Sequence, residues 1–223
     1  MKTSTRRTFL AAGTLVALLV VSVTVYAAAT SDVKFTGDIT TTRVSGYAGD
    51  KVTLKTTGEY SPAISIAWWE VADIPGQVKA RFRHMNTGDI KDATWDNISG
   101  DYERSKKRVA AVGANDYIYK VQVCTNDKKD TSKNVVKGMR VWVRTLKHGP
   151  PLSLTGQNSA IEDTRNHCKK WHAAVACPVG QLASAVVVHT SGGVSALTGL
   201  ALECRPLINI QEAKTIPSGG KRR

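Results

Sequence analysis

The sequence predicts an all-β protein built from three similar sheets around a pseudo-threefold axis, with a β-sandwich as the alternative. Short apolar and β-branched runs alternate with glycine-containing turns, and hardly any segment has the period of a helix. Two blocks, Tyr117–Val143 and Cys177–Leu207, share the layout strand, polar loop, strand, and place Val121 and Val186 65 residues apart. Three copies of about 65 residues match the length of the chain after residue 29, which favours three sheets over a generic sandwich.

Residues 1–29 have the pattern of an export signal peptide. A basic start containing Arg6 and Arg7 precedes the uncharged apolar run Phe9–Val25, and the small residues Ala27–Ala29 form a cleavage site. The segment around the arginine pair resembles the twin-arginine export motif, which would make the source prokaryotic. An ordinary secretory signal and an uncleaved membrane anchor are the alternatives. We expect a secreted, cell-surface or periplasmic protein without a membrane segment once the signal is cleaved.

The remaining chain is strongly basic and long enough for one domain. The formal net charge is +13, and removal of the three basic residues of the signal leaves +10. A secreted domain of this charge attracts polyanions such as acidic polysaccharides and cell-wall polymers. Nucleic acid is not the partner we expect, because an exported protein rarely meets it first. Residues 30–210 are predicted to form the all-β domain, and residues 211–223 a basic flexible tail.

All four cysteines lie in the C-terminal half of the chain. In an exported protein an even number of cysteines indicates disulfides, here two. Cys177 and Cys204 bracket one predicted hairpin. This favours the pairs Cys177–Cys204 and Cys124–Cys168 among the three possible connectivities.

A metal site is the alternative for the same region, because His167, Cys168, His172 and Cys177 fall within eleven residues. Their spacing, however, is neither that of a zinc-protease helix nor a Cys-x2-Cys pair. We therefore expect no metal. The sequence also contains no nucleophile elbow, phosphate-binding loop or dinucleotide-binding fingerprint, so it predicts no cofactor and no catalytic residue.

The first third of the domain predicts two strands joined by a turn. Lys51–Thr56 and Ala63–Val71 flank the turn Gly58–Pro62, and we expect them to pair as the first copy of the repeat. Within the second of these strands, one of the adjacent residues Trp68 and Trp69 must face the core. Between the second and third copies, Ala160–Ala176 is the one segment that we expect to hold a short helix.

The return strand of the second copy carries the candidate binding residues. Strand alternation places Arg140, Trp142 and Arg144 on the face opposite its apolar residues, beside Lys120 and Gln122 of the partner strand. An exposed tryptophan between guanidinium groups can stack on a sugar while the arginines bind carboxylate, sulfate or phosphate. The competing interpretation is that Trp142 packs against another sheet or a loop. Trp171, which lies among basic residues, is either a second outward aromatic side chain or part of the short helix.

Two segments carry a family resemblance. Lys137–Val141 and Thr198–Leu202 stand where the repeats of vitelline membrane outer layer proteins have their return strands, and the blocks that contain them resemble those repeats across residues 117–207. The resemblance implies a β-prism of three Greek-key sheets. Many β-prisms of this and of the jacalin-like kind bind carbohydrate, which is an analogy from fold and does not identify a site.

The leading functional hypothesis is therefore an exported, disulfide-bonded β-domain that binds glycans or acidic cell-surface polymers. The alternative is a structural subunit of a surface layer or filament, which self-assembles when residues 30–57 add a strand to the open sheet edge of a neighbour. The third hypothesis is a secreted carbohydrate-active enzyme, with a carboxylate pair drawn from Glu162, Asp163 and Glu203. We do not expect an enzyme, because acidic residues of this kind are common on protein surfaces.

Overall fold

A computed structural model describes the following parts of the chain: residues 32–71, 73–97, 105–110, 113–130, 133–149, 151–164, 166–191 and 196–210, with the side chains of 105–108 and 156–160 not described. The predicted signal, the predicted basic tail and the Gly192-Gly193 turn lie outside these residues. Within them, no helix is long and apolar enough to cross a bilayer.

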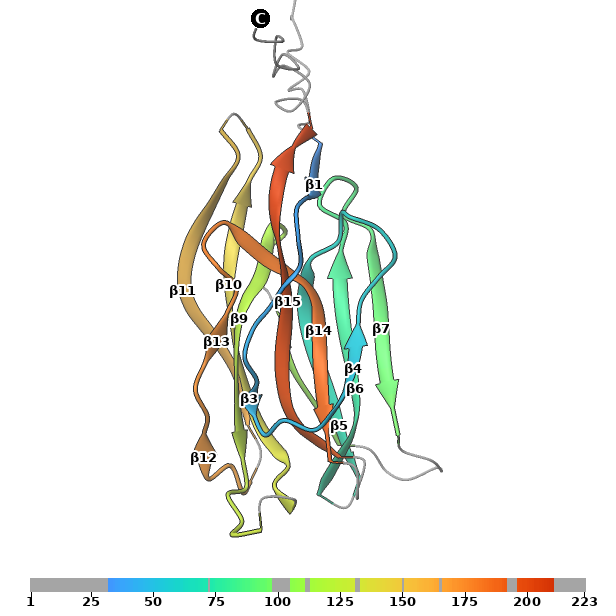
Figure 1. The fold of residues 1–223 in the computed structure, drawn as a ribbon, viewed down its shortest axis with the longest axis vertical. Coiled ribbons are helices and arrows are strands. Elements are labelled where there is room, and N and C mark those ends of the chain that lie inside the picture. Colours follow the sequence, from blue (N-terminus) through green and yellow to red (C-terminus); the bar gives the residue numbers. More distant parts are fainter. Residues whose placement is uncertain are drawn as a thin grey trace, which may run out of the picture.

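The described strands form three antiparallel sheets (Figure 1). The first sheet has the order β7-β6-β5-β8 and consists of β5 (Ala63–Val71), β6 (Ile74–Arg83), β7 (Ile90–Asp96) and β8 (Ser105–Ala110). The second sheet has the order β11-β10-β9-β12 and consists of β9 (Asp116–Thr125), β10 (Val136–Lys147), β11 (Ser153–Thr164), β12 (Lys170–Trp171) and β13 (Val175–Ala176), which also pairs with β9. The third sheet has the order β1-β15-β14-β4 and consists of β1 (Val33–Phe35), β2 (Thr40–Thr41), β3 (Ser45–Gly46), β4 (Asp50–Leu54), β14 (Gln181–Thr190) and β15 (Leu197–Asn209).

The three sheets share one plan. A central hairpin, β5–β6, β9–β10 or β14–β15, is flanked on each side by one further strand or by short strands that pair along the same edge. In the first two sheets the flanking strands follow the hairpin in sequence, which makes each sheet a Greek key. In the third sheet they come from the N-terminal end of the described chain: β1, β2 and β3 pair along β15, and β4 pairs with β14. The predicted arrangement of three Greek-key sheets, a β-prism, is therefore confirmed over the sandwich.

The partner predicted for the strand at residues 51–56 is wrong. β4 pairs with β14, in the register Leu54 opposite Val186, whereas β5 pairs with β6 and β8. The first hairpin is therefore β5–β6, and the three hairpins begin at Ala63, Asp116 and Gln181. The physical reason is that alternation identifies the buried face of a strand but not the neighbour that receives its hydrogen bonds.

The helix predicted within residues 160–176 is also absent from the described part of that segment. β11 continues to Thr164, and β12 and β13 pair with β9. The disulfide between Cys124 and Cys168 holds this segment beside β9, so that its backbone pairs with the sheet instead of coiling on itself.

The core lies between the three sheets. Alternate residues of the central hairpins point inward and are almost completely buried, among them Trp68, Val121, Val141 and Val186. Trp69, the neighbour of Trp68, is half-buried on the opposite face, as the alternation requires. A second cluster, which includes Phe35 in β1, closes the end of the prism at which the hairpins start and finish. The opposite end, at the bottom of Figure 1, is where the strands of each hairpin turn back.

Two disulfides reinforce the second and third sheets. They join Cys124 to Cys168 and Cys177 to Cys204, which is the connectivity that the sequence favoured. Each bridge constrains the unfolded chain and is expected to contribute about 2–4 kcal/mol to stability.

Candidate ligand-binding sites

Three aromatic side chains of the second sheet each have a cation over the ring: two tryptophans on the outer face, and a tyrosine that also packs against the core. On β10, Met139, Val141 and Val143 are buried in the core, so the residues between them point outward and are half-buried. We call this surface the aromatic–cation face. Its stacks are Lys120 Nζ at 4.1 Å from the ring centre of Trp142, Arg140 Cζ at 3.9 Å from that of Trp171, and Arg144 Cζ at 4.1 Å from that of Tyr119.

Strand pairing explains how these side chains meet. Trp142 lies directly opposite Lys120 in the β9–β10 register, and Arg140 lies opposite Gln122. The next aligned pair is Val143 with Ile118, so Tyr119 is an extra residue in a β-bulge. A bulge re-aims side chains, and here it accompanies the contact between Tyr119 and the next outward arginine of β10.

A glycine makes room for the second stack. A Cβ atom at Gly138 would lie 2.9 Å from the Thr164 methyl carbon, 3.2 Å from Cβ of Cys124 and 3.4 Å from the ring of Trp171. Any larger residue at this position would first displace Thr164 and would crowd the disulfide. Gly138 therefore leaves the space in which Thr164, the disulfide and Trp171 pack together beside Arg140.

Hydrogen bonds hold the edge of this face. Glu162 Oε2 accepts from Arg140 Nε at 2.5 Å, and Gln122 Nε2 donates to the backbone oxygen of His172 at 2.6 Å. The ring of His172 contacts the Thr125 hydroxyl at 2.9 Å. Burial lowers the pKa of His172, and the nearby positive charge of Lys170 lowers it further. The imidazole is consequently neutral at neutral pH.

The structure thus brings together the five residues that the sequence nominated for ligand binding, namely Lys120, Gln122, Arg140, Trp142 and Arg144. It also adds Tyr119, which sequence reasoning missed, and Glu162, which sequence reasoning considered only as a catalytic carboxylate and not as a partner of Arg140. No local pattern indicates either residue: the first depends on a bulge, and the second on the pairing of β10 with β11. Trp171 is an outward aromatic side chain, as one of its two sequence interpretations proposed.

The carboxylates considered for glycoside hydrolysis do not come together. Glu162 is paired with Arg140 on the second sheet, and Asp163, the next residue of the same strand, points to the other face. Glu203 lies on β15 in the third sheet, opposite Thr41. This arrangement does not provide two facing carboxyl groups.

The alternative of a metal site at residues 167–177 fails for a chemical reason. Cys168 and Cys177 belong to two different disulfides, so neither has a thiolate to offer. Among the residues that the structure describes, no group of three or more His, Cys, Asp or Glu side chains is placed to hold a metal ion.

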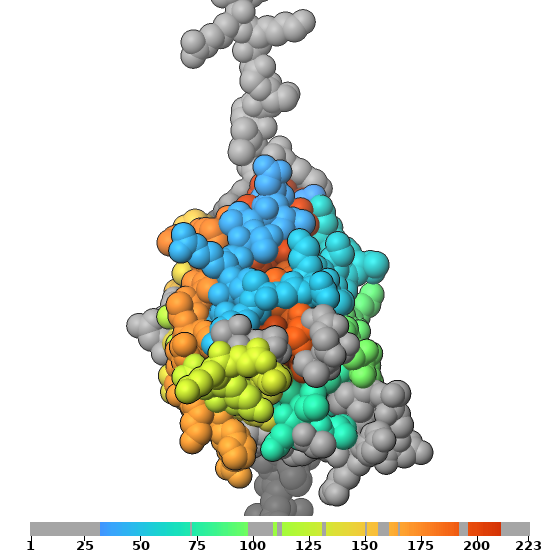
Figure 2. Space-filling model, turned by 60° about the horizontal axis from the view of Figure 1, so that its bottom comes forward, coloured from blue at the N-terminus to red at the C-terminus, as the bar shows by residue number. Residues whose placement is uncertain are grey.

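A second candidate site is a cavity of about 620 Å³ at the end of the prism where the hairpins turn back. We call it the hairpin-end cavity. Three connections line it: the β5–β6 turn, the β9–β10 loop and the loop before β12. Figure 2, in which this end is turned forward, shows the β9–β10 loop (yellow-green) next to the β5–β6 turn (blue-green). Its lining residues are Asp73, Ile74, Asn126, Lys128, Lys133, Val135, Lys137, His167 and Lys169.

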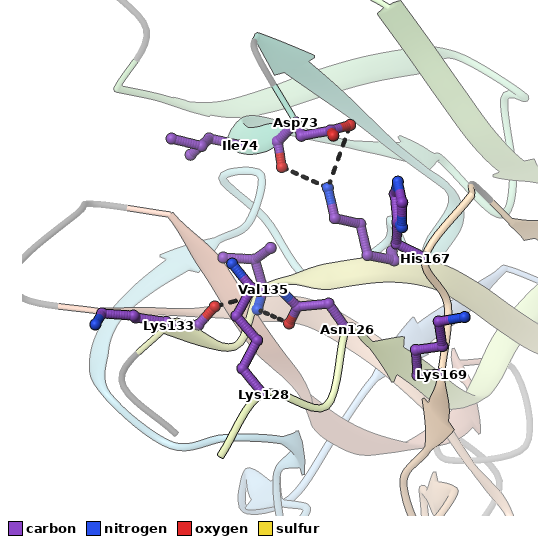
Figure 3. Close-up of a pocket in the computed structure, with 9 residues that line it drawn as sticks. Asp73, Ile74, Asn126, Lys128, Lys133, Val135, His167 and Lys169 are labelled. Atoms are coloured by element: carbon purple, nitrogen blue, oxygen red, sulfur yellow. Dashed lines mark hydrogen bonds and ion pairs between the residues drawn. The ribbon is translucent and has the colours of Figure 1, made fainter. Parts of the chain in front are cut away.

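The lining residues come from different sides of this cavity. Figure 3 shows Asp73 and Ile74 on one side, Lys128 and Lys133 on a second, and His167 with Lys169 on a third. The sequence did not nominate the cavity, because these residues lie in three separate connections and follow no motif.

The three Greek-key sheets define a β-prism protein. No protein-family model and no curated protein matches the sequence. Among solved structures, the chain is similar to the agglutinin of Calystegia sepium, with 13% identity over 77% of this chain and 99% of that one, and a TM-score of 0.46. It is also similar to Malaysian banana lectin, with 8% identity over 76% and 99% and a TM-score of 0.47.

A mannose-binding jacalin-related lectin from Ananas comosus is similar as well, with 11% identity over 75% of this chain and 98% of that one, and a TM-score of 0.42. At these identities and TM-scores the likeness concerns the arrangement of the strands alone. The β-prism implied by the resemblance to vitelline membrane outer layer proteins is present, whereas no family model assigns the chain to that family.

Proposed function

We propose that this protein is a glycan-binding β-prism domain whose aromatic–cation face takes an acidic polysaccharide. The observation that carries the proposal is the occurrence of three aromatic–cation stacks together on one sheet. The outer face of a sheet is open and elongated, so it suits an extended polymer better than a compact small molecule.

The chemistry of the stacks favours acidic sugars. A guanidinium group that lies over a ring keeps its N–H groups in the plane, where they can donate to a carboxylate in a two-bond fork. Arg140 and Arg144 present two such groups on neighbouring outward positions of β10. The high positive charge of the whole chain adds long-range attraction for a polyanion.

The same contacts limit how a sugar can approach. Lys120 already covers Trp142, and Glu162 already accepts from Arg140. We therefore expect the ligand to contact mainly the ammonium and guanidinium groups that cover the rings, and to contact the ring faces themselves less. Binding of this kind weakens as salt rises, since the interacting charges are partly exposed.

Two disulfides are typical of proteins from oxidising compartments. We accordingly include export in the proposal, with a secreted, cell-surface or periplasmic location, and a prokaryotic source as the twin-arginine pattern suggests. Cleavage of residues 1–29 would then release a domain without a membrane segment.

Titration calorimetry with oligogalacturonate, a uronic acid polymer, and with neutral dextran oligomers tests the proposal. We expect binding of oligogalacturonate, no measurable binding of dextran, and a loss of about tenfold or more for Trp142→Ala, because an aromatic stack and its neighbours contribute on the order of 1 kcal/mol or more. Trp69→Ala is the matched control: Trp69 is another half-buried tryptophan, with Lys79 Nζ 5.9 Å from its ring centre, on the first sheet. Equal affinity of the Trp142 variant and the wild type would refute the site.

A second candidate function is self-assembly through the N-terminal strands. β1 and β4 form the two edges of the third sheet, and Asp50, Lys51 and Val52 on β4 are exposed. An edge of this kind can accept a strand from a neighbouring molecule. Light scattering on the mature protein over a wide concentration range distinguishes the two functions, since a strict monomer at the highest concentration rules out assembly.

A further inference from the structure

The hairpin-end cavity contains positive charges that the aromatic–cation face does not use. Four of its lining side chains are lysines, one is a histidine and one is an aspartate. A volume of about 620 Å³ lies within the range usual for small-molecule sites. The cavity is therefore large enough for a monosaccharide with an attached charged group.

Carboxylates balance two of the lysines. Lys137 is buried, and its Nζ lies 3.7 Å from a carboxylate oxygen of Glu70 and 3.7 Å from one of Asp73, whose backbone oxygen it also contacts. Lys133 pairs with Asp130 at 3.1 Å. These two lysines need no external anion.

Lys128 and Lys169 differ in this respect. In the part of the chain that the structure describes, no carboxylate lies within ion-pair distance of either ammonium group, although both line the cavity. Both residues are exposed, so water solvates their ammonium groups in the free protein, and an anion that enters the cavity meets two cations without carboxylate partners. The uncompensated charge therefore points to an anionic ligand.

The loop that carries Lys128 is already held in place. Asn134, which is fully buried, accepts from the backbone nitrogen of Lys128 at 2.5 Å and donates to its backbone oxygen at 3.1 Å. Asn126 accepts from the backbone nitrogen of Val135 at 3.0 Å and donates to the backbone oxygen of Lys133 at 3.3 Å. Two asparagines thus hold the described parts of the β9–β10 loop on either side of residues 131–132, which reduces the entropy that these parts lose on binding.

Backbone strain occurs at the same place. Among the described residues, the non-glycine positions with positive φ are Asp73 (65°), Asp127 (47°) and His167 (77°). Two of them line the cavity, and the third lies between two lining residues. Left-handed backbone in a non-glycine residue costs stability and is concentrated at ligand sites.

The kinds of side chain present indicate the class of anion. No arginine lines the cavity among the described residues, so no planar fork is available to match a carboxylate. Lysine ammonium groups act as point charges, which suit a compact and multiply charged oxyanion. Ile74, which is exposed, and Val135 supply an apolar wall against which a sugar ring can pack.

We propose that the hairpin-end cavity binds a phosphate or sulfate ester carried on a sugar, with Lys128 and Lys169 as its charge partners. The site goes beyond the proposed function of the aromatic–cation face, from which it differs in elements and in side-chain chemistry. Either site can therefore exist without the other.

Titration calorimetry of the mature protein in a phosphate-free buffer tests this proposal with three probes: mannose 6-phosphate, mannose and inorganic phosphate. We expect mannose 6-phosphate to bind most tightly, inorganic phosphate more weakly and mannose at least tenfold more weakly than its phosphate ester. Mannose 6-sulfate should follow mannose 6-phosphate. Equal affinity for mannose and its phosphate ester overturns the proposal, and equal affinity for inorganic phosphate and the ester overturns its sugar part.

A pair of double variants with the same change in net charge locates the site. Lys128→Ser with Lys169→Ser should weaken mannose 6-phosphate binding at least tenfold. Lys91→Ser with Lys147→Ser, which lie at the start of β7 and the end of β10 and so at the other end of the prism, should change it by less than twofold. Equal losses in both double variants would mean that diffuse charge, and no built site, binds the ester.

Two further measurements keep the test independent of folding and of the proposed function. Chemical-shift changes in the wild-type protein should centre on Ile74 and His167 when mannose 6-phosphate is added, and shifts confined to other regions contradict the proposal. Trp142→Ala should bind mannose 6-phosphate as the wild type does, so that failure of the aromatic–cation face leaves this result unchanged.

Discussion

The aromatic–cation face and the hairpin-end cavity are both positively charged, but their cations are held in different ways. On the face, each cation lies over an aromatic ring, and the sheet register sets its position. In the cavity, three of the four lysines extend from connections between strands and Lys137 extends from the start of β10, while asparagines and carboxylates hold the backbone and Lys137 in place. Charge alone therefore does not describe either surface.

The difference indicates two kinds of recognition within one domain. Ring-backed guanidinium groups on an open sheet face favour repeated planar carboxylates along a chain. Clustered ammonium groups in a concave site favour one compact anion. Substitutions can therefore change one of the two regions, both of them, or the ion pair and the disulfide that support them.

The largest effect is expected from Lys137→Met. The side chains of Lys137 and Glu70 are 3% and 1% exposed, so the substitution leaves a buried carboxylate without its lysine. Breaking such a pair costs about 3–5 kcal/mol in free energy of unfolding. Urea denaturation measures the loss, and the double variant with Glu70→Gln should recover part of it. A single variant as stable as the wild type would show that this pair does not support the cavity.

Removal of one disulfide should weaken both regions. The bridge from Cys124 to Cys168 ties β9 to the segment that carries His167 and Lys169 on the cavity side and Trp171 on the face. The variant with both cysteines replaced by alanine should lose about 2–4 kcal/mol of stability and bind oligogalacturonate and mannose 6-phosphate more weakly.

The other disulfide is the control. Replacement of Cys177 and Cys204 should lower stability to a similar degree while the folded protein keeps both affinities. Thermal unfolding and calorimetry on the same preparations measure the two quantities. If both disulfide variants lose the same binding, the bridge at Cys124 has no particular role.

A smaller and more selective effect is expected from replacing Arg140 and Arg144 by lysine. Charge is preserved, but the planar group that stacks on Trp171 or Tyr119 is lost. Affinity for oligogalacturonate should fall about threefold to tenfold, which corresponds to roughly 1 kcal/mol, while mannose 6-phosphate binding stays unchanged. Arg81→Lys on the first sheet is the matched control. Full retention of oligogalacturonate affinity would mean that charge, and not the stack, matters on the face.

The smallest effect is a dependence of stability on pH. Burial lowers the pKa of His172 and of His189 in the folded protein. The unfolded chain takes up protons near pH 6.5, so it binds more protons than the folded chain just below that pH. The stability that comes from the neutral rings is therefore present above about pH 6.5 and is lost as pH falls through the lowered folded values. Urea denaturation from pH 7.5 to 5 should show this decline, and His172→Gln should reduce it; a flat profile in the wild type contradicts the assignment.

The sequence predicted the parts of the molecule that depend on local alternation. The period of two along β10 placed Trp142 outward and Val141 inward, and the disulfide between Cys177 and Cys204 followed from their places around one hairpin. Pairing across long separations was not predictable in this way. The sequence of β4 is that of a hairpin strand that would pair with β5, the next strand in the chain. In the structure β4 pairs instead with β14, which lies far along the chain.

The hairpin-end cavity was beyond sequence reasoning for a related reason. Asp73, Lys128 and Lys169 belong to connections that only the closed prism brings together. A lysine in a polar loop is ordinarily a solvated surface residue, and nothing local distinguishes Lys128 from its neighbours. Its significance comes from the buried Asn134 that fixes its backbone, which is a tertiary contact.

The third sheet joins the two ends of the described chain and so sets an order on folding. β1 to β4 are made well before their partners β14 and β15. The first two sheets can assemble from consecutive strands, whereas the third must wait until residue 209 is available. Contacts between such distant segments are slow to form. Until then β1 and β4 have no strands to pair with. A nascent or truncated chain is therefore at greatest risk of aggregation before β14 and β15 are made.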